Sequence, residues 1–170
     1  TIGFELTEVG EHYILIKSFS REEEENINIT IRKCFLLVKE MNSLVLSDIQ
    51  TKNFKNTPTI NDLTNNVQKL ANYALRASTK TIKDLAKIQY HARIFSNLYL
   101  FSLKIKHLYT FLPREKISPA TVLVLQRLFS LFDLFYTSYY SQKITLISQI
   151  IVGKEEIVRE LDKTIDKGNG

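Results

Sequence analysis

The sequence predicts a mainly α-helical protein: an antiparallel bundle of about five helices, preceded by a short β-hairpin or extended arm over residues 1–19. Apolar residues recur at helical spacing through most of the chain after residue 20. The 170 residues include five glycines, three prolines and no tryptophan, a composition that disfavours a turn-rich all-β protein. Short polar segments separate the apolar stripes, and short connections place neighbouring helices antiparallel.

The N-terminal segment has the pattern of two short strands. Ile2, Phe4 and Leu6 alternate with polar residues, the glycine-containing stretch "EVGEH" follows, and the apolar pattern resumes near Leu15. An isolated hairpin is only marginally stable in water. We therefore expect this arm to pack on the helices or to pair with sequence upstream. Because the chain begins with threonine and opens directly into the strand pattern, we expect a fragment of a longer protein.

Two helices are expected in the first half of the chain. Four glutamates follow Ser20, and acidic side chains stabilise a first turn because they lie at the positive end of the helix dipole. The stripe of the first helix consists of Ile27, Ile31, Phe35, Val38, Met41, Val45 and Ile49. The polar stretch "TKNFKNTPT" ends this helix, and a second is expected over about residues 60–78. The stripe of the second helix consists of Leu63, Val67, Leu70, Ala74 and Ala77.

A third helix is expected over about residues 82–111, and Pro113 ends it. Its stripe consists of Leu85, Ile88, Ala92, Phe95, Tyr99 and Ile105. No glycine or proline separates it from the second helix, so the pattern leaves open whether a turn near "STKT" joins the two. The three helices form a predicted three-helix repeat over residues 20–112.

Two further helices are expected to form a partial second repeat over residues 117–165. Ser118 is a predicted N-cap, and Pro119 suits the first helical position. The stripe of the fourth helix consists of Val122, Leu125, Phe129, Phe132, Phe135 and Tyr139. The amphipathic stretch "KITLISQIIVGKEEIVRELDKTI" follows, with Gly153 as a predicted weak point, and residues 166–170 are expected to form a disordered tail.

Composition predicts a soluble cytoplasmic protein. The net charge of +5 mildly favours a polyanionic partner, although lysine-rich helices also serve solubility alone. The single Cys34 excludes an intrachain disulfide framework, which is typical of a reducing compartment. No secretory signal pattern is present. The longest uncharged apolar stretches, residues 94–103 and 144–153, fall short of the ~20 residues that a membrane-spanning helix needs, so no membrane insertion is expected.

The residues that could carry chemistry are scattered. His12, His91 and His107 have no metal-ligand spacing with one another or with Cys34. Cys34 lies among apolar residues, which predicts a buried, inert thiol rather than a nucleophile. Asp133 interrupts the aromatic run "LFSLFDLFYTSYY", and we expect it to face solvent rather than to be a buried functional carboxylate. The sequence thus predicts a protein that is not an enzyme and holds no cofactor.

Four basic residues are candidates for a partner-binding strip. Arg76, Lys80, Lys83 and Lys87 are spaced by four, three and four residues, and this spacing would line one face of a continuous helix. Such a strip would bind an acidic partner. A helix break near residue 79 would separate the four side chains, and an ordinary solvated face is the alternative.

The fourth predicted helix has more apolar surface than one neighbour can cover. Four residues extend beyond its main stripe and are candidates for a homodimer interface: Leu123, Leu131, Leu134 and Phe135. A helix in a small bundle needs an apolar arc of only about 100°. A symmetric homodimer would cover the excess, and the alternative is an internal fit between the first and fifth helices.

The order of elements resembles the PhoU family of phosphate-uptake regulators, in particular the archaeal form that carries an AbrB-like DNA-binding domain before its PhoU region. The resemblance spans residues 2–161 and depends on "IGFE", "IRKCFLLVKEMNSLVLSDI", "NNVQKLANYALRAS" and "DLAKIQYHARIFSNLYLFSLKI". It implies a non-enzymatic regulator that acts through a protein partner or as a homodimer. It also implies an AbrB-like domain upstream, through which alone the protein would contact DNA.

The chain departs from this family at the metal-binding positions. The family holds metal through acidic residues on its second and third helices. The residues that align with those positions here are Thr64, Gln68, Ser96, Asn97 and Leu100. In the last segment Glu155 retains one acid, but Arg159 stands where its partner belongs. Hard cations need anionic or carbonyl oxygen ligands, so the metal sites are expected to be lost. A generic helical dimerisation or adaptor module, unrelated to phosphate, is the alternative function.

Overall fold

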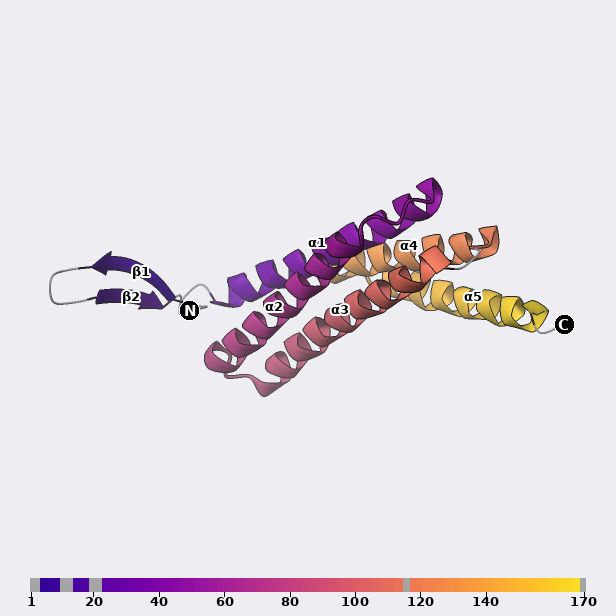
Figure 1. Ribbon diagram of the computed structural model, residues 1–170. Coiled ribbons are helices and arrows are strands. Elements are labelled where there is room, and N and C mark those ends of the chain that lie inside the picture. Colours follow the sequence, from indigo (N-terminus) through magenta and orange to yellow (C-terminus); the bar gives the residue numbers. More distant parts are fainter. Residues whose placement is uncertain (1–3, 10–13, 19–22, 115–116, 169–170) are drawn as a thin grey trace.

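The computed structural model describes residues 4–9, 14–18, 23–114 and 117–168. The protein is mainly helical and contains five α-helices in this part of the chain, which confirms the predicted helical bundle (Figure 1). The helices are α1 (Glu23–Thr51), α2 (Thr57–Thr81), α3 (Leu85–Phe111), α4 (Pro119–Ser141) and α5 (Ile144–Gly168). A 3-10 turn, η1 (Leu112–Arg114), follows α3. The strands are β1 (Phe4–Val9) and β2 (Ile14–Ser18).

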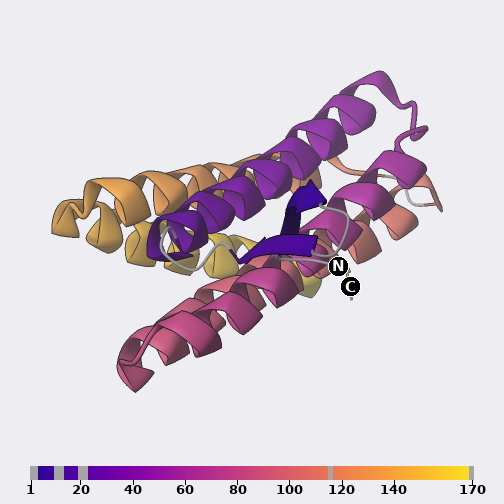
Figure 2. The ribbon, with the colours of Figure 1, turned by 90° about the vertical axis from the view of Figure 1, so that its left-hand side faces the viewer.

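Helix α1 organises the bundle. It packs against α2, α3 and α4, while α2 also packs on α3 and α5 packs on α4 (Figure 1). The first three helices form one antiparallel unit, and the α4–α5 hairpin lies against the α1 side of that unit (Figure 2). Helix α5 is therefore one layer further from α1 than α4 is.

The two strands form an antiparallel pair whose register runs from Phe4 opposite Ser18 to Val9 opposite Ile14. The register shifts between Leu6 and Glu8. The pair lies beyond the N-terminal end of α1 (Figure 1), and in the described part of the chain neither strand packs along a helix. The predicted turn "EVGEH" falls largely on residues 10–13, which lie outside the described residues.

Capping residues set the helix boundaries. Ser118 Oγ accepts a hydrogen bond of 3.1 Å from the Thr121 amide, and Pro119 is the first helical residue of α4, so the predicted N-cap is confirmed. Asp84 caps α3 by accepting a 2.9 Å hydrogen bond from the Ala86 amide. Residues 82–84 therefore interrupt the helix, which answers the question that the stretch "STKT" leaves open.

The core contains the complete apolar stripe of α1. All seven of its predicted core residues are buried: Ile27, Ile31, Phe35, Val38, Met41, Val45 and Ile49. Phe35 is fully buried, and its ring centroid lies 5.5–6.2 Å from five aromatic rings of α4, namely Phe132, Phe135, Tyr136, Tyr139 and Tyr140. Phe132 also stacks on Phe101 of α3 at 4.9 Å, so aromatic contacts fix α4 on the first three helices.

Helix α5 packs along α4, although few of its described side chains are fully buried there. Ile157 is buried there, and Arg127 of α4 forms an ion pair with Glu160. A Cβ atom at Gly153 would come within 2.6 Å of Leu131 Cδ2, so the absence of a side chain lets the two helices approach closely. Helix α5 runs through Gly153 without a break. It continues to Gly168 and so includes part of the segment 166–170 that was expected to be a disordered tail.

Replacement of Phe35 by alanine is expected to lower the free energy of unfolding by about 3–5 kcal/mol, because it leaves a cavity among the α4 rings. The matched control is Phe111→Ala, since Phe111 is mostly exposed in α3 and its truncation is expected to cost less than about 1 kcal/mol. Urea denaturation followed by circular dichroism measures both. Equal losses in the two variants would contradict the central role of Phe35.

Candidate functional site

The most densely hydrogen-bonded side chains form a buried polar cluster at the C-terminal end of α1. Asp48 accepts hydrogen bonds from Asn56 Nδ2 at 2.8 and 3.0 Å and from the Tyr109 hydroxyl. The Tyr109 oxygen in turn accepts a 3.0 Å hydrogen bond from the Asn56 amide. Asp48 and Tyr109 are both almost fully buried. The cluster joins α1, the loop before α2, and α3, so its hydrogen-bonding capacity is used for structure.

Sequence reasoning did not identify this cluster. Asp48 lies in the last turns of the first helix, and nothing in the sequence spacing connects it to Tyr109, which lies 61 residues later. Burial and the hydrogen bond to Asp48 together raise the pKa of Tyr109 to about 12.

The other candidate reactive groups are separate from one another. Cys34 is fully buried in α1, as predicted, and burial raises the pKa of its thiol to about 12, which keeps it protonated and inert. His91 is buried in α3 whereas His107 is exposed, and His12 lies outside the described residues. Asp133 faces solvent, as predicted, and its carboxylate lies 3.1 Å from Lys39 Nζ. Within the described ranges no three His, Cys, Asp or Glu side chains are placed to hold a metal ion.

The positions that align with the family's metal ligands carry side chains of other kinds. Thr64 is buried in α2, and its hydroxyl donates a 2.8 Å hydrogen bond to the Ile60 carbonyl of its own helix. The exposed members are Gln68, Ser96, Asn97 and Leu100. Glu155 is exposed, and its carboxylate lies 3.7 Å from the Arg159 guanidinium. No two of these aligned positions present carboxylates that could bind the same metal ion.

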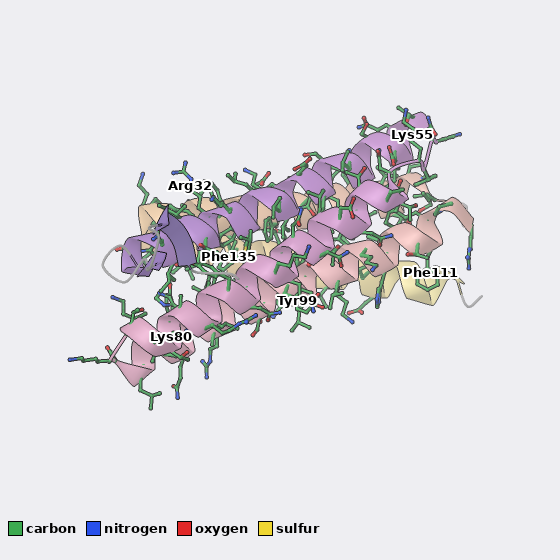
Figure 3. All side chains as sticks on the ribbon, turned by 60° about the vertical axis from the view of Figure 1, so that its left-hand side comes forward. Arg32, Lys55, Lys80, Tyr99, Phe111 and Phe135 are labelled. Carbon is green, nitrogen blue, oxygen red and sulfur yellow. The ribbon has the colours of Figure 1, made fainter. Side chains whose placement is uncertain are left out.

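The predicted basic strip does not lie on one continuous helix, because α2 ends at Thr81 and α3 begins at Leu85. Arg76 and Lys80 belong to α2, Lys83 lies in the connection and Lys87 lies in the first turn of α3. Arg76, Lys80 and Lys83 are exposed, and Lys87 is half-buried. The structure thus gathers the four at the α2–α3 end of the bundle, where Figure 3 shows Lys80 extending outward. Their binding of an acidic partner stays a prediction.

The four α4 residues predicted at a dimer interface have different surroundings. Leu123 and Phe135 are exposed, but Leu131 and Leu134 are half-buried, and Leu131 packs against Gly153 of α5. Helix α5 thus covers part of the face that the sequence assigned to a second copy. The predicted interface on α4 is otherwise a prediction still to be tested.

The largest group of exposed apolar side chains lies on α5 instead. Its members are Ile144, Ile147, Ile151, Val152, Val158 and Leu161, and we call this group the outer α5 face. Beside it, a hollow of about 510 Å³ is lined mainly by Tyr90, Phe135 and Tyr139 together with Ile147, Ile150 and Ile151. A second hollow, of about 970 Å³, lies where the end of α1 meets the start of α4 and includes Phe54, Leu112, Val122 and Leu123. Both hollows are mostly apolar and are open to solvent.

Helix α4 also passes a length and composition test for a membrane span. It has 23 residues, and the mean hydropathy of its most apolar window is 1.3. Helix α4 is not among the longest uncharged apolar stretches of the sequence, because Arg127 and Asp133 interrupt its apolar run. A mostly buried core helix of a soluble protein satisfies the same test, but only 22% of this window is buried, with Phe129 and Phe132 among its buried residues. A single helix that satisfies a test of length and composition does not assign α4 to a membrane.

Comparison of the chain with protein-family models, with curated proteins and with solved structures finds no match.

The raised pKa of Tyr109 predicts a loss of stability in alkali. The unfolded chain releases the tyrosine proton near pH 10, whereas the folded protein holds it until about pH 12. The contribution of this bound proton to the free energy of unfolding is on the order of 2 kcal/mol. It is complete below pH 10 and is lost as the pH rises to about 12. Urea denaturation at pH 8 to 12 should show a shallower decline for Tyr109→Phe than for the unaltered protein. Tyr73→Phe, in the half-buried middle of α2, should decline like the unaltered protein.

The side chains at the aligned ligand positions predict a protein without stoichiometric metal. Elemental analysis of untagged protein should find no equivalent of iron, zinc or manganese, because Thr, Gln, Ser, Asn and Leu cannot form an anionic ligand set. A full equivalent of metal held by α2 and α3 in the unaltered protein would contradict the prediction.

Proposed function

We propose that this chain is a PhoU-like, non-enzymatic helical module of a phosphate-uptake and transcription regulator, and that it acts in the cytoplasm through protein contacts. The observation that carries the proposal is the exposed outer α5 face with its neighbouring aromatic hollow, on a bundle whose α1 core is otherwise well packed. Large apolar surfaces of this kind on soluble proteins are typical of interaction sites.

The order of the helices supports the phosphate-related part of the proposal. Three antiparallel helices are followed by two more that lie against the first, in the order that the resemblance to PhoU implies. The chemistry of the described side chains supports a non-enzymatic role. The buried carboxylate of Asp48 is already hydrogen-bonded by Asn56 and Tyr109, and the buried thiol of Cys34 is protonated. In this proposal DNA is contacted through an AbrB-like domain upstream.

The same apolar surface also supports the alternative, a helical dimerisation or adaptor module unrelated to phosphate. The two functions differ in what they predict for a cell: a phosphate regulator changes phosphate transport when it is lost, whereas an unrelated adaptor does not.

A deletion and complementation experiment tests the proposed function. Cells that carry the gene are grown in high and in low phosphate, and uptake of radiolabelled phosphate is measured with the transcript level of their phosphate transporter. Deletion is expected to abolish the difference between the two media, and the unaltered gene is expected to restore it. Leu36→Glu, on an exposed part of α1, is a control variant that should restore the response equally well. An unchanged response in the deletion strain would favour the adaptor function.

A further inference from the structure

The sequence of α5 contains two apolar stripes, and the structure covers one of them. The residues turned toward α4 recur at spacings of four, three, four and three: Leu146, Ile150, Gly153, Ile157 and Glu160. These residues are buried or half-buried in the described structure. A second series recurs at spacings of three, four, three, four and three: Ile144, Ile147, Ile151, Lys154, Val158 and Leu161. We call this second series the outer seam.

Every member of the outer seam is exposed. Ile144 is 79% exposed and Ile151 is 53% exposed, although isoleucine is among the residues most often buried in folded proteins. Alternation of three and four residues is the spacing by which one helix packs along another in a coiled coil. The two stripes lie about 100° apart around the helix, so a helix could pack on the outer seam while α4 remains in place.

We propose that the outer seam binds the outer seam of a second copy of this chain, in antiparallel orientation about a two-fold axis near residues 152–153. The seam is self-complementary about its middle. Antiparallel pairing places Ile144 opposite Leu161 of the other copy and Ile147 opposite Val158, so apolar side chains meet at both ends. Closed two-fold pairing of one surface with itself is the commonest form of protein self-association.

The charge of Lys154 disfavours the parallel orientation. In parallel, in-register pairing the two Lys154 side chains would lie directly opposite each other in the middle of the apolar seam. In antiparallel pairing each Lys154 lies opposite Ile151 of the other copy, and that copy's Lys154 and Glu155 both lie about one turn away along the helix. The first arrangement places like charges directly opposite each other, whereas the second moves them apart and places an acidic side chain at a similar distance, which offsets part of their repulsion.

The exposed area of the seam reaches the upper end of what soluble monomers leave open. At roughly 150–200 Å² for a fully exposed large apolar side chain, the five apolar residues of the outer seam leave on the order of 450 Å² open on each chain, and Val152 does not contribute because it lies on another side of α5. Tyr90 and Phe135, which line the adjoining hollow with Ile147 and Ile151, bring the total to about 600 Å². Soluble monomers rarely expose a patch above about 600 Å², and a standard interface buries about 800 Å² on each partner.

Light scattering at micromolar concentration tests the association. The unaltered protein should have twice the 19.7 kDa mass of one chain. Ile151→Lys should give the monomer mass with unchanged helical circular dichroism, because antiparallel pairing places it opposite Lys154 of the other copy, so that like charges meet twice in the middle of the seam. Leu100→Lys is the matched control, since Leu100 is also an aliphatic residue that is 53% exposed on a helix, and it should stay dimeric.

Cross-linking tests the orientation, in a Cys34→Ser background that removes the native thiol. Chains with Ile144→Cys mixed with chains with Leu161→Cys should form a heterodimer with a short thiol cross-linker. Neither variant should cross-link with itself, because antiparallel pairing puts the two identical positions about 25 Å apart. Self-cross-linking of Ile144→Cys would show parallel pairing and overturn the orientation.

Three results would overturn the second copy as the occupant of the seam. These are a monomeric unaltered protein, whether or not it binds lipid vesicles or another protein; a dimer that survives Ile151→Lys; and a dimer that Leu123→Glu dissociates in its place. The inference goes beyond the proposed function and is measured on purified protein. An unchanged phosphate response with a confirmed dimer would contradict the proposed function alone, and a monomer with an altered phosphate response would contradict the seam alone.

Discussion

Burial of α1 on several sides is the constraint on which the rest of the structure depends. Its stripe is wide enough to pack against α2, α3 and α4 together, and Phe35 is the contact shared by the five rings of α4. Helix α5 packs on α4 rather than on α1, and this order of layers leaves its outer seam exposed.

Polar interactions complete the core rather than direct it. Asp48, Asn56 and Tyr109 form a closed set of hydrogen bonds that fixes where α1 ends and the next helix begins. Inside a bundle a carboxylate is tolerated only when its oxygens are satisfied, so the three residues depend on one another. The Lys39–Asp133 pair between α1 and α4 is solvent-exposed and contributes at most about 1 kcal/mol. Aromatic packing, and not charge, therefore decides how α4 sits on α1.

Much of the fold could be predicted from periodicity because each helix has a stripe that one or more neighbours bury. The stripes of α1 and the N-cap at Ser118 are examples. The break at residues 82–84 could not be settled, because Asp84 breaks the helix through a side-chain hydrogen bond rather than through glycine or proline. Which face of α4 stays open could not be predicted either. The answer depends on where α5 docks, and the close approach at Gly153 is visible only in three dimensions.

Self-association would add to the stability of α5, because most of its described residues are exposed although it packs along α4. Ordering a helix residue costs about 1–2 kcal/mol of backbone entropy, and isolated helices are marginal in water. Against this cost, α5 gains its own backbone hydrogen bonds and a surface ion pair between Glu160 and Arg127. It also buries Ile157 and partly buries Leu146 and Ile150. Burial of the outer seam against a second copy would add apolar contacts along its whole length. Since a partner that binds only the folded state stabilises that state by mass action, the free energy of local opening of α5 should rise with protein concentration while that of α1 to α3 stays constant. Hydrogen exchange of the α5 amides, measured at low and high protein concentration, would show this difference in protection within one molecule.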